Sequence, residues 1–133
     1  MEESIIRFIE RQTCASICCV DGDGRPHCFA CYYAFDSSKA LLYFKSSPGS
    51  RHMQLLLRQP AVSGTILPDR IRLLAVQGLQ FHGMWLPKDH PSIPSATEKY
   101  HLKYPFALAI PGEVSAIQLQ SVKMASRKPG GKK

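Results

Sequence analysis

The segment from Phe44 to His52 combines residue types that bind phosphate groups. It reads Phe-Lys-Ser-Ser-Pro-Gly-Ser-Arg-His and lies between a predicted strand and a predicted helix. At such a junction the N–H groups of the first helical turn are free, and the helix dipole favours an anion. Arg51 can hold a phosphate with two hydrogen bonds, and His52 can donate one. The alternative is an ordinary helix cap, in which Ser47 or Ser50 bonds the free N–H groups and Arg51 is solvated.

The cysteines suggest a second kind of chemistry. There are five in the chain, and Cys28-Phe-Ala-Cys31 has the spacing of a redox or zinc motif. This motif falls in a predicted strand, where positions three apart point to opposite faces. Zinc also needs a turn and a second pair of ligands. We therefore predict no metal site and free thiols, and the odd number of cysteines favours a cytoplasmic protein.

Hydrophobic periodicity and turn signals divide the chain into nine elements. Turn-forming residues at 21–26 and 36–39 separate the first three strands. Pro60 ends the second helix, and Gly78 and Gly83 interrupt the longest strand. The predicted helices cover 3–12, 46–58 and 92–103, and the predicted strands cover 14–20, 27–36, 41–45, 61–67, 71–86 and 114–124.

This order of elements predicts the fold class. Parallel strands would need helices between most of them, whereas the two early turns favour antiparallel pairing. Six strands with few helices indicate a mainly β protein, a small antiparallel barrel flanked by helices. A chain of 133 residues fits one domain, which we place at 1–124, followed by a disordered basic tail at 125–133.

The positive charge is concentrated near the carboxyl end. The net charge is +7, but the stretch from Lys123 to Lys133 holds five basic residues and no acidic one. The preceding part is close to neutral, which argues against a broad nucleic-acid-binding face. A nucleic-acid contact made by the tail is the remaining alternative to a solvated end. No apolar run approaches the roughly 18 residues of a membrane span, and Met1-Glu2-Glu3 lacks the basic start of a secretory signal.

The order of several short motifs resembles a known family. Asp23-Gly-Arg-Pro26 is followed by Leu42-Tyr-Phe44, Ser50-Arg-His52, Gln59 to Thr65 and Val76 to Gly83. This series resembles the pyridoxamine 5′-phosphate oxidase-like split-barrel flavoproteins, and within them the small bacterial UPF0306 (YhbP-like) family. The likeness runs from about Ile5 to Met124. It implies a six-stranded antiparallel split β-barrel that forms a homodimer and binds FMN between its subunits.

The resemblance also implies positions for the cofactor. In such proteins the residues after the third strand hold the ribityl phosphate, and the second strand passes along the flavin ring. Carried onto this chain, the phosphate residues are Lys45, Ser46, Ser50, Arg51 and His52, and the ring residues are Phe29, Ala30, Cys31 and Tyr32.

The chain departs from the oxidase pattern at three of these or neighbouring positions. His52 stands where the oxidase family commonly has Lys, Phe29 stands where it has an Arg, and Leu73 falls near a position where it has a flavin-facing Gln. Each change removes a polar FMN contact, and residues for the substrate phosphate of the vitamin B6 oxidase have no match. Three functions follow: an FMN-dependent oxidoreductase of unnamed substrate, a non-catalytic binding module for FMN or another anionic cofactor, and a nucleic-acid-associated protein acting through its tail. No catalytic residue is assigned.

Overall fold

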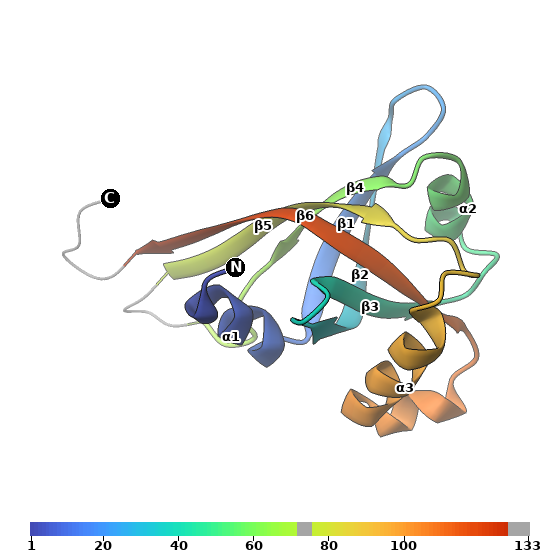
Figure 1. The fold of residues 1–133 in the computed structure, drawn as a ribbon. Coiled ribbons are helices and arrows are strands. Elements are labelled where there is room, and N and C mark those ends of the chain that lie inside the picture. Colours follow the sequence, from blue (N-terminus) through green and yellow to red (C-terminus); the bar gives the residue numbers. More distant parts are fainter. Residues whose placement is uncertain (72–75, 128–133) are drawn as a thin grey trace.

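The strands form a closed barrel, with helices against its surface and one end (Figure 1). The computed structural model describes residues 1–71 and 76–127. Within them the chain forms, in order, α1 (Glu3–Arg11), β1 (Cys14–Val20), β2 (Pro26–Asp36), β3 (Leu41–Ser46), α2 (Arg51–Arg58), β4 (Ala61–Ile66), β5 (Val76–Trp85), α3 (Ile93–Lys103), the short 3₁₀ helix η1 (Pro105–Ala109) and β6 (Glu113–Arg127).

Every neighbouring pair of strands in the barrel is antiparallel, in the order β1-β2-β3-β6-β5-β4. Pairing of β1 with β4 closes the ring, with Ile17 opposite Gly64. A side chain at Gly64 would collide with the Phe81 ring and with the carbonyl oxygen of Ser16, so this closure requires glycine. The predicted six-stranded antiparallel barrel is confirmed.

The turn between β1 and β2 depends on one carboxylate. Asp21 Oδ1 accepts hydrogen bonds from the backbone N–H groups of Asp23 and Arg25, both at 2.9 Å. Gly24 has a φ of 79°, a conformation that glycine adopts without strain. These local interactions explain why the hairpin could be predicted from the sequence.

The barrel interior and two helices share one hydrophobic core. Alternate residues of the strands point inward, among them Ile17, Leu42 and Phe81, and each is almost fully buried. Helix α1 adds Ile9 to this core, and α2 adds Leu56. Packing against the core therefore holds α2 at the end of β3, and this contact positions the predicted phosphate segment.

A second hydrophobic cluster fixes α3 to the outer face of the barrel. Tyr100 and Tyr104 pack with Ala34, Tyr43 and residues of β6. Helix α3 thus covers β2, β3 and β6, and Figure 1 shows it at the end of the barrel where β3 and β6 meet.

Two strand boundaries differ from the prediction by more than one residue. Strand β6 continues to Arg127, so Ala125 to Arg127 pair with β5 and do not belong to a tail; residues 128–133 lie outside the described residues. Strand β5 begins at Val76, not at 71, and residues 72–75 are also outside the described part. The predicted bend at Gly83 is present as a shift in register between His82 and Gly83. In the parts of the chain described here, no helix is long and apolar enough to cross a membrane.

Candidate functional site

Two hydroxyl groups and one imidazole meet between the end of β3 and the start of α2. Ser46 Oγ lies 2.5 Å from His52 Nε2, and Ser50 Oγ lies 3.2 Å from the same nitrogen. The two serine oxygens are 3.4 Å apart. All three side chains are half-buried. Ser46, Ser50 and His52 therefore form a polar cluster, and the structure brings together three of the residues predicted to hold phosphate.

The charge on His52 follows from its surroundings. Burial lowers the pKa of the imidazole, and the nearby His27 lowers it further. Its ring is also stacked on the ring of Phe29, with centroids 3.8 Å apart and planes 9° from parallel. At neutral pH the imidazole is therefore neutral and can accept hydrogen bonds from serine hydroxyls at Nε2. The sequence suggested that His52 could supply positive charge to a phosphate, and the lowered pKa argues against that role at neutral pH.

The first turn of α2 keeps its free N–H groups. Ser50 is the N-cap residue, but its side chain makes no capping hydrogen bond within the described structure. Its hydroxyl is directed to His52 instead, so the simple capping alternative does not apply to Ser50. The exposed N-terminal turn of a helix of this kind attracts anions.

Arg51 supplies the positive charge at this helix start. Its side chain is exposed and makes no ion pair with any described residue. It lines a hollow of about 640 Å³ between α2 and the turn that joins β1 to β2. Asp21, Gln54 and Arg58 line the same hollow. Arg51 is therefore available for an anionic ligand.

Lys45 is directed away from this cluster. Its Nζ donates a hydrogen bond to the carbonyl oxygen of Ala107 at 2.7 Å and lies 3.0 Å from His101 Nε2. Adjacent residues of a strand point to opposite faces, so Lys45 cannot share the site of Ser46 without leaving these partners. The structure thus places Lys45 in the contact between β3 and the α3–η1 region.

The four residues predicted to pass along a flavin ring divide between two faces of β2. Phe29 and Cys31 point inward and pack against the core, whereas Ala30 and Tyr32 are exposed on the outer face. Burial raises the pKa of the Cys31 thiol to about 12, so it is protonated at neutral pH. Of the four, Phe29 alone contacts the polar cluster, through its stack on His52.

Sequence reasoning missed a buried carboxylate that joins α3 to the barrel. Asp36 Oδ2 accepts a hydrogen bond from Lys99 Nζ at 2.5 Å and another from the Tyr43 hydroxyl at 3.2 Å. Burial alone would raise the pKa of Asp36, but the hydrogen bonds and charge of Lys99, with those from Ser38 and Tyr43, hold it well below its ordinary value. Lys99 lies 63 positions further along the chain, so no local pattern marks this pair.

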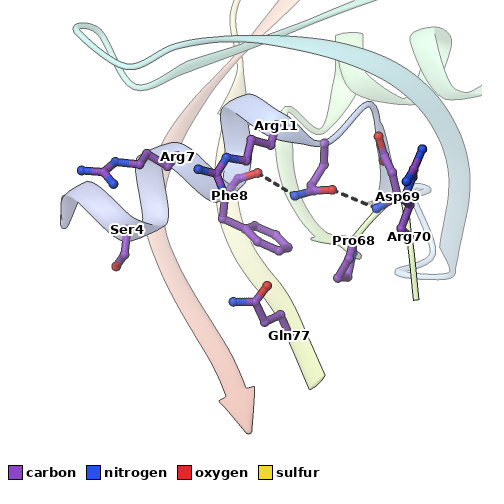
Figure 2. Close-up of a pocket in the computed structure, with 9 residues that line it drawn as sticks. Ser4, Arg7, Phe8, Arg11, Pro68, Asp69, Arg70 and Gln77 are labelled. Atoms are coloured by element: carbon purple, nitrogen blue, oxygen red, sulfur yellow. Dashed lines mark hydrogen bonds between the residues drawn. The ribbon is translucent and has the colours of Figure 1, made fainter. Parts of the chain in front are cut away.

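A second hollow, of about 480 Å³, lies beside α1 (Figure 2). Arg7, Arg11 and Arg70 line it, which makes it a possible anion site on composition alone. In Figure 2, however, Arg7 and Arg70 lie at opposite ends of the hollow. Asp69 also faces it, although both of its carboxylate oxygens accept hydrogen bonds from Thr13. The three arginines are therefore not arranged around a single anion.

The remaining predictions for the site concern metals and Leu73. Within residues 1–71 and 76–127, no group of three or more His, Cys, Asp or Glu is placed to hold a metal ion. Cys28 and Cys31 do point to opposite faces of β2, as their spacing predicted. Leu73, the third departure from the oxidase pattern, lies outside the described residues.

Known proteins with similar sequences carry one family name. A UPF0306 protein of Haemophilus ducreyi is 31% identical over 99 residues, which cover 73% of this chain and 68% of the relative. A UPF0306 protein of Photorhabdus laumondii is 26% identical over 130 residues, covering 97% of this chain and 90% of the relative. No family model matches the chain.

Solved structures with this fold have little sequence identity to the chain. An FAD-binding protein of Mesorhizobium loti superposes with a TM-score of 0.73 at 16% identity, covering 96% of both chains. HutZ, the heme storage protein of Vibrio cholerae, superposes with a TM-score of 0.70 at 17% identity, covering 92% of both chains. These superpositions confirm the split-barrel fold. Together with the Haemophilus relative, they show that this chain is a split-barrel protein that belongs to the UPF0306 family.

Proposed function

We propose that this protein binds FMN and holds the cofactor's phosphate at the start of α2. The observation that supports the proposal most strongly is the Ser46–Ser50–His52 cluster beside an uncapped helix start, where Arg51 has no ion-pair partner among the described residues. The free N–H groups of the helix start and one guanidinium are donors that suit a phosphate monoester. The flavin-binding member among the similar structures supports a flavin as the group attached to that phosphate.

The proposed activity is a flavin-dependent oxidoreduction. A bound flavin accepts and donates hydride or electrons, while the protein orients the ring and excludes side reactions. In this chain Phe29 offers an apolar ring where the oxidase pattern has an arginine, so it can pack against a flavin but cannot hydrogen bond to it.

The experiment is to purify the protein and record its visible absorption spectrum, and then to add NADH or NADPH without oxygen. Bound flavin that is bleached by either donor supports an oxidoreductase. A protein that carries no flavin and takes up none on addition of FMN would contradict the proposal.

A non-catalytic binding module is the second candidate, and the Phe29–His52 stack favours it. Phe29 stands where the oxidase pattern has an arginine, and its ring stacks on His52, which replaces a common lysine. The heme storage protein among the similar structures is a split barrel named for storage of its ligand. A bound flavin or heme that no pyridine nucleotide reduces would support this candidate over the first.

We also propose that the protein is a cytoplasmic homodimer. Leu102, Phe106 and Leu108 of α3 and η1 have relative exposures of 73%, 61% and 71%. The exposed ring of Tyr32 is close to them, because the Tyr104 ring lies 6.0 Å from Tyr32 and 6.1 Å from Phe106. Such a group of large apolar side chains is typical of an interface between subunits. The five free thiols fit a reducing compartment. Light scattering on the purified protein tests the dimer, and a monomer at all concentrations would contradict it.

A further inference from the structure

The five cysteines all lie on the β1–β2 hairpin, and two of them are direct partners across it. Cys18 of β1 is opposite Cys28 of β2 in an uninterrupted register that runs from Cys14 to Val20. Cys28 and Cys31 have the spacing of a motif, but the pleat of β2 places them on opposite faces. The fold pairs Cys28 with Cys18 instead.

The hydrogen bonds of the hairpin define the geometry of this pair. The N–H of Asp21 donates to the carbonyl of Arg25, and the N–H of Tyr33 donates to the carbonyl of Thr13, each at 2.9 Å. Because bonded and non-bonded pairs alternate along an antiparallel ladder, Cys18 and Cys28 form a non-hydrogen-bonded pair. Cα atoms in such pairs lie about 4.5 Å apart, which is within the range that a disulfide spans. A bond between the two sulfurs therefore requires no shift of the strands.

The two thiols also share one face of the hairpin and are open to solvent. Cys28 is exposed and Cys18 is half-buried on the same outer face of the hairpin. The neighbouring Cys28 thiol, with burial adding to its effect, raises the pKa of Cys18. The direct pairing in register and the shared outer face place the two side chains next to each other.

The other three cysteines do not compete for either partner. Cys19 is buried on the inner face, where its thiol donates to the carbonyl oxygen of His27 at 3.4 Å. Cys31 also points inward. Cys14 shares the outer face, but it lies four residues from Cys18, or about 13 Å along the strand.

We propose that Cys18 and Cys28 are a thiol–disulfide site that exchanges with a low-molecular-weight disulfide such as oxidised glutathione. The exposed Cys28 thiolate attacks one sulfur of oxidised glutathione and releases one glutathione thiolate. Cys18 then loses its proton, attacks the Cys28 sulfur of the mixed disulfide and releases the second glutathione thiolate. The two protein sulfurs are oxidised, the two glutathione sulfurs are reduced, and the two protons leave with the products.

The test uses the full-length protein, reduced, desalted and equilibrated with oxidised glutathione before free thiols are blocked with N-ethylmaleimide. Trypsin alone cannot separate the cysteines, because Arg25 precedes Pro26 and all five remain in peptide 12–39. Further cleavage before Asp21, Asp23 and Asp36 yields peptide 12–20 with three cysteines and peptide 23–35 with two. We expect these two peptides to be linked, with fragmentation assigning the bond to Cys18 and Cys28 and the other three thiols blocked.

Variants define the outcome further. Cys28→Ser should form no link, and Cys18→Ser should leave Cys28 as a mixed disulfide with glutathione. Cys14→Ser and Cys31→Ser are the matched controls and should form the link as the natural chain does. A link between other cysteines, a link only between two molecules, or glutathione retained on the natural chain without a link would overturn the proposal. The fragmentation result on the natural chain decides this even if a variant fails to fold.

Discussion

Replacing Arg51 by alanine should weaken the binding of FMN without affecting riboflavin. Arg51 is the cation at the first turn of α2, and its guanidinium has no ion-pair partner among the described residues. Riboflavin has the same ring and ribityl chain as FMN but no phosphate. If the phosphate lies at this helix start, only the phosphorylated ligand makes the contact that the substitution removes.

The expected magnitude follows from the exposure of Arg51. A hydrogen bond between charged groups contributes about 1.5–3 kcal/mol, and the exposed guanidinium is partly screened by water and salt. We expect a loss of about 2 kcal/mol, which corresponds to a dissociation constant about 30-fold higher. Because the contact is exposed, the difference should shrink as potassium chloride is added.

The assay measures the quenching of flavin fluorescence as protein is added to FMN or to riboflavin. It compares the natural chain with Arg51→Ala and Arg58→Ala. Arg58→Ala is the matched control, because Arg58 is also exposed and lines the same hollow. It lies about 10 Å away along the axis, in the last turn of α2. Equal weakening by both substitutions, an unchanged FMN affinity for Arg51→Ala, or an equal loss for riboflavin would refute the assignment of the phosphate to this helix start.

Three further predictions concern the framework of the site. Asp36→Asn should lower the free energy of unfolding by about 2 kcal/mol, because the half-exposed Lys99 loses its buried partner; urea denaturation that shows no loss would contradict this. Since the pKa of Asp36 is lowered in the folded state, its stabilisation is present above about pH 4 and is lost as pH falls further. The free energy of unfolding of this variant should therefore change less with pH below about 4 than that of the natural chain. The pKa of His52 is also lowered, so stability should fall as pH decreases below 6.5; His52→Asn should reduce that fall, and an unchanged profile would argue against a buried neutral imidazole. Gly64→Ala should cost about 3 kcal/mol because its Cβ would lie 2.6 Å from the Ser16 carbonyl oxygen, whereas Gly22→Ala, with nothing within 4 Å, should be nearly neutral in the same thermal melts.

The elements of the barrel could be predicted because their signals are local. The Asp21–Gly24 turn, Pro60 after α2 and the alternation within β1 each depend on residues close in the chain, and the observed bounds lie within a few residues of the predicted ones. The end of β6 was predicted too early. Its last residues are held by pairing with β5, and their basic composition suggested a tail.

The candidate site was predictable in part for the same reason. Ser46, Ser50 and His52 lie within one strand-to-helix junction, so their proximity follows from the local sequence. The hydrogen bond from Lys45 to Ala107, the stack of Phe29 on His52 and the pairing of Cys18 with Cys28 each join separate elements. Such contacts depend on the register and closure of the barrel, which periodicity alone does not specify.

The most direct test of the central claim is an equilibrium titration of the natural chain with FMN and, in parallel, with riboflavin. We expect saturable binding of FMN with a dissociation constant of about 10 μM or lower, and riboflavin bound at least about 30-fold more weakly because it lacks the phosphate that Arg51 would contact. An FMN titration that does not saturate by about 50 μM, or equal affinity for the two ligands, would contradict a phosphate site at the start of α2.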